Sequence, residues 1–133
     1  MDQQKLTTLR AALLTRRDEI TADLDRLEQE MQWLGEEQQT ERGSLGNHLA
    51  DDGTSVMEQE RIATVRDDLR ALLQQIEAAL ERMDEGTYGV CQRCGKPIHE
   101  ERLEAFPYVA FCIECQTHLE RQHALYGPIE RVT

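Results

Sequence analysis

Hydrophobic residues recur every seven positions over the first quarter of the chain. The row consists of Leu6, Leu13, Ile20, Leu27 and Leu34. Leu24 and Met31 fill the companion position of this seam in its second half. Arg10 and Arg17 hold that position earlier, so the seam is polar near the N-terminus. Because a sustained seven-residue spacing is the signature of a left-handed coiled coil, the pattern predicts a helix over residues 4–34.

A second row with the same spacing predicts another helix over residues 56–84. Its two seams are Ile62, Leu69, Ile76 and Met83, and Val65, Leu72 and Ala79. Leu73 and Leu80 widen the apolar stripe toward the C-terminal end. Thr54 is the predicted N-cap, and Gly86 follows the last periodic residue as a stop signal.

The two apolar stretches have nearly equal length, which favours an antiparallel hairpin with Leu34 near Val56 and Leu6 near Met83. The connection between them contains Gly35, Gly43, Gly46 and Gly53. A structureless connection of this length is uncommon within a compact domain. We therefore expect a partly helical tip at about residues 41–54, with the first helix able to continue past Gly35.

The composition changes after residue 84. All four cysteines lie in this region, and Trp33 is the one aromatic residue before Tyr88. Residues 113–124 can form a short closing helix, and the tail begins near Gly127-Pro128. The sequence thus predicts a helical hairpin over 1–84, a small module over 85–125 and a tail over 126–133.

The overall composition supports a mainly α fold of long solvated helices that share a narrow apolar seam. The chain has 133 residues, of which 39% are hydrophobic, 5% aromatic and 31% charged. Its net charge of −11 repels phosphate backbones, which argues against direct sequence-specific binding of nucleic acid and favours a partner with a basic surface. No stretch approaches the roughly 20 apolar residues of a membrane span, and no signal peptide precedes the first helix, so we expect a cytoplasmic protein.

The cysteines form two matched pairs, Cys91-x-x-Cys94 and Cys112-x-x-Cys115. Each pair can direct two thiolates at one point, and two pairs supply the tetrahedral sulfur site that zinc prefers. Gly95 suits a knuckle in which backbone N–H groups bond the ligand sulfur. Such a small module buries little surface, so metal binding would supply folding energy. The sequence predicts one structural Zn²⁺ ion.

Four other interpretations of the cysteines carry less weight. A pair of disulfides suits a secreted protein, and a redox Cys-x-x-Cys motif usually occurs singly. An iron–sulfur cluster needs four thiolates too, but the paired spacing is more typical of zinc. A site closed by four cysteines leaves no open coordination position, so catalytic zinc is also disfavoured.

The residues around the cysteines resemble the DksA/TraR zinc-finger family. The resemblance rests on three segments, residues 88–98 (YGVCQRCGKPI), 102–107 (RLEAFP) and 112–115 (CIEC). Together with the predicted hairpin it covers roughly residues 5–120. The family implies a coiled-coil hairpin that enters the secondary channel of bacterial RNA polymerase, with acidic tip residues near the catalytic magnesium.

The predicted tip departs from the family signature Asp-x-x-Asp-x-Ala. His48 stands at the first Asp, Asp51 keeps the second, and Gly53 replaces the Ala. The segment is more similar to a stress-protein branch with an Asn-His-x-Ala-Asp-x-Gly tip. Phe106 occupies a position that is often basic in the family, so binding of the alarmone ppGpp is not expected.

The candidate tip residues also have simpler interpretations. Asp51 is the residue we expect to act on a partner, although a helix-capping role would explain it too. Asp52 suits a favourable charge at a helix N-terminus, and His48 is either a tip contact or a solvated residue. Trp33 is equally consistent with partner contact and with packing over the tip. His99, His118 and His123 are expected on the surface, because four thiolates complete the metal site.

Together with these features, the resemblance implies a bacterial, non-enzymatic transcription regulator that binds RNA polymerase mainly through the hairpin and the zinc module. His48, Asp51, Asp52 and Gly53 are the predicted partner-binding residues of the tip, which would act on the catalytic centre. The alternative is a zinc-stabilised coiled-coil stress or interaction protein that acts on another partner. No nucleophile–base pair or phosphate loop supports an enzyme. The sequence leaves the oligomeric state open, since heptad seams pair between chains as well as within one.

Overall fold

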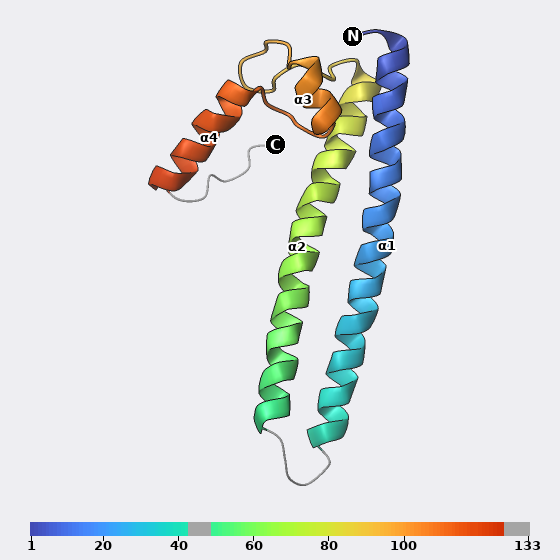
Figure 1. Ribbon diagram of the computed structural model, residues 1–133, viewed down its shortest axis with the longest axis vertical. Helices are drawn as coiled ribbons and strands as arrows, with labels where there is room; N and C mark the ends of the chain where they lie inside the picture. Colours follow the sequence, from blue (N-terminus) through green and yellow to red (C-terminus); the bar gives the residue numbers. More distant parts are fainter. Residues whose placement is uncertain (43–48, 127–133) are drawn as a thin grey trace. The chain divides into compact units, whose positions relative to one another are not determined.

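The computed structural model describes residues 1–42 and 49–126, with side-chain placement for residues 1–36 and 55–125. Four helices follow one another along the chain (Figure 1). They are α1 (Gln3–Arg42), α2 (Leu49–Glu85), α3 (Glu100–Ala105) and α4 (Ile113–Tyr126). The described residues contain no strand beyond one isolated antiparallel bridge between Val90 and Pro97. The prediction of a mainly α fold is confirmed.

The chain forms two compact units. The hairpin unit comprises residues 15–74, and the base unit comprises residues 1–14 together with the chain from residue 75 onward. Helices α1 and α2 each contribute one segment to each unit. The domain boundary at residue 84 that the composition predicts stays a prediction.

In the hairpin unit, the segments of α1 and α2 lie side by side and run in opposite directions (Figure 1). Ile20 and Ile62 are fully buried, and Leu34 is nearly so. The other predicted seam residues of this unit are half-buried, namely Leu24, Leu27, Met31, Val65, Leu69, Leu72 and Leu73. The heptad pattern therefore identifies the residues that these two helical segments bury.

Both long helices include residues of the connection that lie beyond the apolar pattern. Helix α1 continues to Arg42, because most residues after Gly35 are strong helix formers and a single glycine costs only about 1 kcal/mol in a helix. Helix α2 begins at Leu49, so the prediction of Thr54 as its N-cap is wrong. Two acidic residues, Asp51 and Asp52, fall in the first turn, where negative charge favours a helix.

The core of the base unit joins the two hairpin helices to the cysteine-rich segment. Its buried apolar residues are Leu9, Leu13, Ile76, Ala79, Leu80, Met83, Ile98 and Leu103. Leu103 lies on α3, a helix that the sequence pattern did not predict. Side chains from the start of α1, the end of α2 and α3 thus contribute to one unit.

Helix α2 ends at Glu85, directly before Gly86, the residue that the sequence predicts as its stop signal. This glycine has a φ of 80°, and its N–H donates to the carbonyl of Met83 at 3.3 Å. The N–H of Thr87 donates to the carbonyl of Arg82 at 2.9 Å. This pair of bonds is a Schellman motif, in which a glycine in the left-handed region closes the helix.

Ion pairs connect the beginning of α1 to later parts of the base unit. The Lys5 ammonium lies 2.6 Å from a carboxylate oxygen of Glu100 and 3.0 Å from one of Glu104. Arg10 contacts Asp84 at 2.8 Å. The side-chain hydrogen bonds with Glu100 and Glu104 raise the pKa of Lys5, so it stays charged. Arg10, which the heptad pattern marks as a polar interruption, therefore pairs with the end of α2.

Candidate metal centre

The first cysteine pair lies on a tight turn after α2. The N–H of Cys91 donates to the carbonyl of Lys96 at 2.8 Å, and the N–H of Gly95 donates to the carbonyl of Cys91 at 3.0 Å. Gly95 has a φ of 77°, in the left-handed region that favours glycine. The Gly95 N–H therefore bonds a backbone carbonyl rather than a sulfur. The glycine serves the knuckle by closing the turn.

The second cysteine pair lies at the start of α4. Cys112 directly precedes the helix, and Cys115 is its third residue. The carbonyl of Cys112 accepts a hydrogen bond from the N–H of Gln116 at 2.9 Å, which begins the helical bonding. A turn and a helix N-terminus thus present two thiols each. The closing helix predicted over 113–124 is present and extends to Tyr126.

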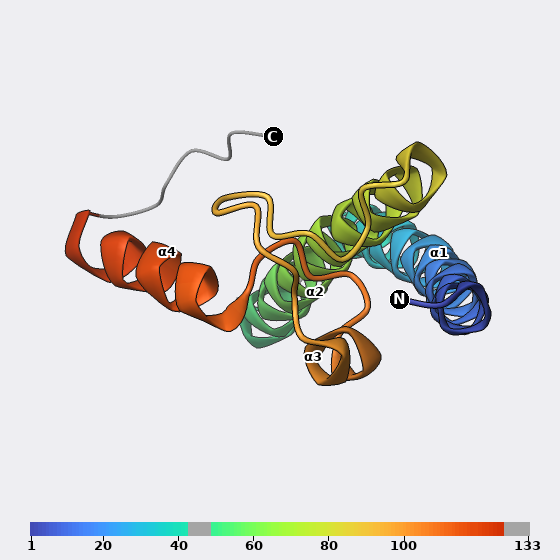
Figure 2. The same cartoon turned by 90° about the horizontal axis from the view of Figure 1, so that it is seen from above.

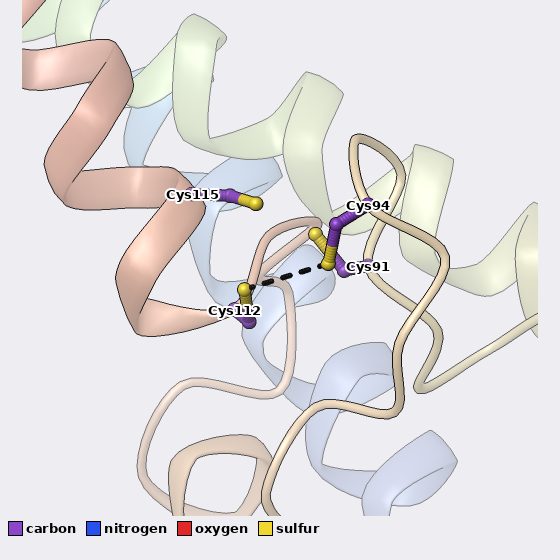
Figure 3. A group of neighbouring side chains, drawn as sticks. All are labelled: Cys91, Cys94, Cys112 and Cys115. Atoms are coloured by element: carbon purple, nitrogen blue, oxygen red, sulfur yellow. Dashed lines mark hydrogen bonds between the residues drawn. The ribbon is translucent and has the colours of Figure 1, made fainter.

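The structure brings all four sulfur atoms together (Figure 3). They lie within 4.8 Å of one another, and the Cys94 and Cys112 sulfurs are 3.8 Å apart. A tetrahedral zinc ion with Zn–S bonds of about 2.3 Å separates its ligand sulfurs by about 3.8 Å. Cys91 and Cys115 are buried and Cys94 is exposed. The four cysteines therefore have the spacing and chemistry that would hold one structural Zn²⁺ ion.

The surroundings of the cysteines favour different proton states at different sulfurs. Burial acts to raise the pKa of Cys91, but the backbone N–H groups of Cys94, Cys112 and Arg93 outweigh it and lower that pKa to about 6. The Arg93 guanidinium acts to lower the pKa of Cys115, whereas burial and the neighbouring thiols raise it to about 11. Since thiolates bind zinc, the metal displaces protons from this cluster when it binds.

Hydrogen bonds hold the segment that precedes Cys112. The Tyr88 hydroxyl donates to the carbonyl of Pro107 at 2.8 Å, and Arg102 Nε donates to the carbonyl of Phe111 at 3.1 Å. The N–H of Gln92 donates to the carbonyl of Ala110 at 2.8 Å, which links the first knuckle to this segment. These bonds fix the approach of the second cysteine pair to the first.

Other candidate residues lie away from the sulfur cluster or outside the described part. His99, His118 and His123 are exposed, as predicted. His48 lies outside the described residues. Asp51, Asp52 and Gly53 lie at the beginning of α2, where the structure gives the backbone only. Their role at a tip stays a prediction.

Two aromatic residues that the sequence singles out are exposed. Trp33 is 59% exposed on α1, and Phe106 is 48% exposed at the end of α3. The ring of Phe106 meets that of Tyr108 edge to face, with centroids 6.3 Å apart.

The view in Figure 2 shows α3 and α4 as separate elements of the base unit. No helix in the described residues is long and apolar enough to cross a membrane.

The sequence comparisons point to one family. Residues 86–121 match the model of the prokaryotic dksA/traR C4-type zinc finger. The chain is 37% identical over 103 residues to General stress protein 16O of Bacillus subtilis, covering 71% of this chain and 63% of that protein. It is 32% identical to an uncharacterized protein of Aquifex aeolicus, covering 96% of this chain and 85% of that protein.

Relatives described as transcription factors match as well. The RNA polymerase-binding transcription factor DksA of Caulobacter vibrioides is 37% identical over 82 residues, which are 60% of this chain and 58% of that protein. The structure of transcription factor DksA2 from Pseudomonas aeruginosa matches with a TM-score of 0.74 at 27% identity, covering 93% of this chain and 89% of that one. The clustered cysteines, the helical fold and these relatives agree, and the chain belongs to the DksA/TraR C4-type zinc-finger family.

Proposed function

We propose that this protein is a transcription regulator that binds bacterial RNA polymerase. The observation that carries the proposal is the similarity to DksA2 over 93% of the chain, together with sequence identity to RNA polymerase-binding factors. The net charge of −11 supports a partner with a basic surface rather than a direct DNA contact. This role assigns no catalytic residue.

The proposal extends to the site of action. The chain would bind at the secondary channel and direct the facing ends of α1 and α2 toward the catalytic centre. Asp51 would act there, with His48, Asp52 and Gly53 beside it. The Cys₄ centre would keep the base unit folded for its own contact with polymerase, because a structural zinc site contributes folding energy outright.

The first experiment is size-exclusion chromatography of the zinc-loaded protein with bacterial core polymerase, followed by competition with a Gre-type cleavage factor. Co-elution that the Gre-type factor abolishes supports binding at the secondary channel. Co-elution that the Gre-type factor leaves unchanged contradicts binding at the secondary channel but supports RNA polymerase as the partner. Absence of co-elution at micromolar concentration sinks the transcription assignment.

A paired substitution tests the tip. The variant carrying Asp51→Ala and His48→Ala should bind polymerase as the parent does but lose its effect on transcription in vitro. Asp68→Ala is the matched control, because it removes the same charge from an exposed position further along α2. A double variant that regulates as well as the parent, or a control that fails equally, contradicts the proposed role of the tip.

The similarity to General stress protein 16O favours a second candidate, a zinc-stabilised stress or interaction protein with another partner. The same chromatography separates the two candidates. A folded, zinc-loaded chain that does not bind polymerase supports the second. Binding competed by a Gre-type factor removes the need for it.

A further inference from the structure

Arg93 contacts sulfur atoms of both cysteine pairs. It lies inside the first knuckle, between Cys91 and Cys94, and its backbone N–H faces the sulfur of Cys91. Its guanidinium reaches the second pair, where Nη1 donates to the sulfur of Cys115 at 3.6 Å. One residue therefore belongs to the first half of the metal site and donates a hydrogen bond to a sulfur of the second half.

The charge of the loaded site explains why such a donor matters. Four thiolates and one Zn²⁺ ion carry a net charge of about −2, in a chain whose net charge is already −11. Cys115 is only 4% exposed, so water has little access to its sulfur. A hydrogen bond from a charged donor is roughly twice as strong as a neutral one, and guanidinium stays charged at any pH the protein meets.

We propose that Arg93 is a positioning residue of the Cys₄ centre, whose guanidinium orients the Cys115 sulfur through its hydrogen bond and strengthens the binding of zinc. The inference concerns the metal site alone and does not depend on the proposed function in transcription. It distinguishes Arg93 from Lys96, a cation of the same knuckle whose side chain makes no hydrogen bond or ion pair with the described residues.

The test compares Arg93→Gln with Lys96→Gln in the full-length chain. Both substitutions remove one positive charge from the first knuckle, but only the former removes the bond to Cys115. Zinc affinity is measured by competition with a chromogenic chelator. Mutation of a residue that hydrogen-bonds a metal ligand typically lowers metal affinity by about 10–100-fold. Arg93→Gln should therefore weaken zinc binding about tenfold. Lys96→Gln should leave it unchanged.

Cobalt substitution provides a readout that a general loss of stability would not move. A hydrogen bond to sulfur lowers the energy of the sulfur electrons, so its loss should shift the sulfur-to-cobalt charge-transfer band of Arg93→Gln to longer wavelength. The band of Lys96→Gln should match that of the parent. Equal zinc affinities for the two variants, or an unshifted band in Arg93→Gln, would overturn the proposal.

Arg93→Lys keeps the inference testable if the glutamine variant does not fold with zinc. Lysine retains the charge but lacks the planar fork of the guanidinium. It should show a smaller loss of affinity and a smaller shift of the band in the same direction. Parental values of both quantities in Arg93→Lys would overturn the assignment of the sulfur bond to Arg93.

Discussion

Different kinds of contact stabilise the interior of the base unit and the interior of the hairpin unit. In the hairpin unit, apolar residues repeat along two helices, and ion pairs such as Arg61–Glu58 join residues three positions apart. In the base unit, side chains bond residues that are far apart in the sequence. Lys5 pairs with Glu100, and the Tyr88 hydroxyl bonds the carbonyl of Pro107.

This difference has a physical origin. A repeating seam buries a similar amount of apolar surface in every heptad, so no single position decides the fold of the hairpin unit. The cysteine-rich segment is short and has few buried side chains, among them Ile98 and Leu103. Such a segment needs a metal or specific polar bonds to offset the entropy of ordering its chain. The base unit should therefore respond to single changes that the hairpin unit tolerates.

Removal of zinc should have the largest effect. Structural zinc contributes apparent free energies of about 10–16 kcal/mol in isolated zinc-finger peptides, so a chelator should unfold the cysteine-rich part of the base unit. Hydrogen exchange measured by mass spectrometry should show lost protection in peptides from residues 86–121 and retained protection around Ile20 and Ile62. Cys115→Ser should reproduce this pattern.

Restoring zinc to the chelated parent should recover the protection, whereas Cys115→Ser should not recover it fully. Retained protection in residues 86–121 after zinc removal would show that apolar packing alone folds this segment. Equal loss in both units would remove the distinction between them.

Truncation of a buried side chain should have the next largest effect. We expect a similar loss of unfolding free energy in both units, but an effect on the metal site only for the truncation in the base unit. Ile20 and Leu103 are both fully buried, the first in the hairpin unit and the second on α3. Ile20→Ala and Leu103→Ala should each cost about 2–5 kcal/mol of unfolding free energy. Leu103→Ala should also accelerate zinc transfer to a chelator, because α3 lies in the segment between the two cysteine pairs.

Ile20→Ala should leave the rate of zinc transfer near that of the parent. A comparable acceleration in both variants would mean that the seam of the hairpin unit and the metal site unfold together. Urea unfolding gives the free energies, and chelator kinetics give the second quantity.

The periodic part of this comparison could be predicted from the sequence, because heptad spacing and burial share one cause. Ile20, Ile62 and Ile76 were placed in the seam by spacing alone, and all are fully buried. The clustering of the cysteines was predictable too, since two Cys-x-x-Cys turns have few ways to satisfy four thiolates. The prediction of the N-cap at Thr54 was wrong because a residue type suited to capping does not show whether the residues before it are also helical.

The polar bonds of the base unit could not be predicted in this way. Nothing periodic relates Lys5 to Glu100, or Arg93 to Cys115, and their pairing depends on the folded path of the chain. Helix α3 has only six residues, too few to show a period of 3.6. A cation inside the first Cys-x-x-Cys motif was the available signal for Arg93, and it does not specify which sulfur the guanidinium reaches.

Two glycines should respond to the same substitution in opposite directions. Gly86 has a φ of 80° and nothing within 4 Å of a Cβ built there, so Gly86→Ala should cost about 1–2 kcal/mol through backbone strain alone. Gly35 lies within α1 and also has open space around an added Cβ. Gly35→Ala should therefore stabilise the protein by about 0.5–1 kcal/mol.

Thermal unfolding of the zinc-loaded proteins should lower Tm for Gly86→Ala and raise it for Gly35→Ala. Destabilisation by both changes would mean that α1 bends or breaks at Gly35. Stabilisation by both changes would contradict the left-handed backbone conformation of Gly86 at the end of α2.

The smallest effect should come from one hydroxyl in the base unit. Tyr88→Phe removes the bond to the Pro107 carbonyl and should cost about 1 kcal/mol of unfolding free energy near neutral pH. Tyr108→Phe is the matched control, since its hydroxyl makes no hydrogen bond with the part of the chain that the structure describes. Burial raises the pKa of Tyr88 to about 12, against the weaker opposing effect of Arg82, from an ordinary value of 10.0.

The sign of the pH dependence follows from that shift. Folding favours the neutral phenol of Tyr88, so its contribution is fully present below pH 10.0 and is lost as the pH rises through about 12. Urea unfolding of the parent should therefore weaken over this range more than that of Tyr88→Phe, and the two free energies should converge. Parallel pH curves, or an equal cost for Tyr108→Phe near neutral pH, would show that the hydroxyl of Tyr88 adds nothing specific to the base unit.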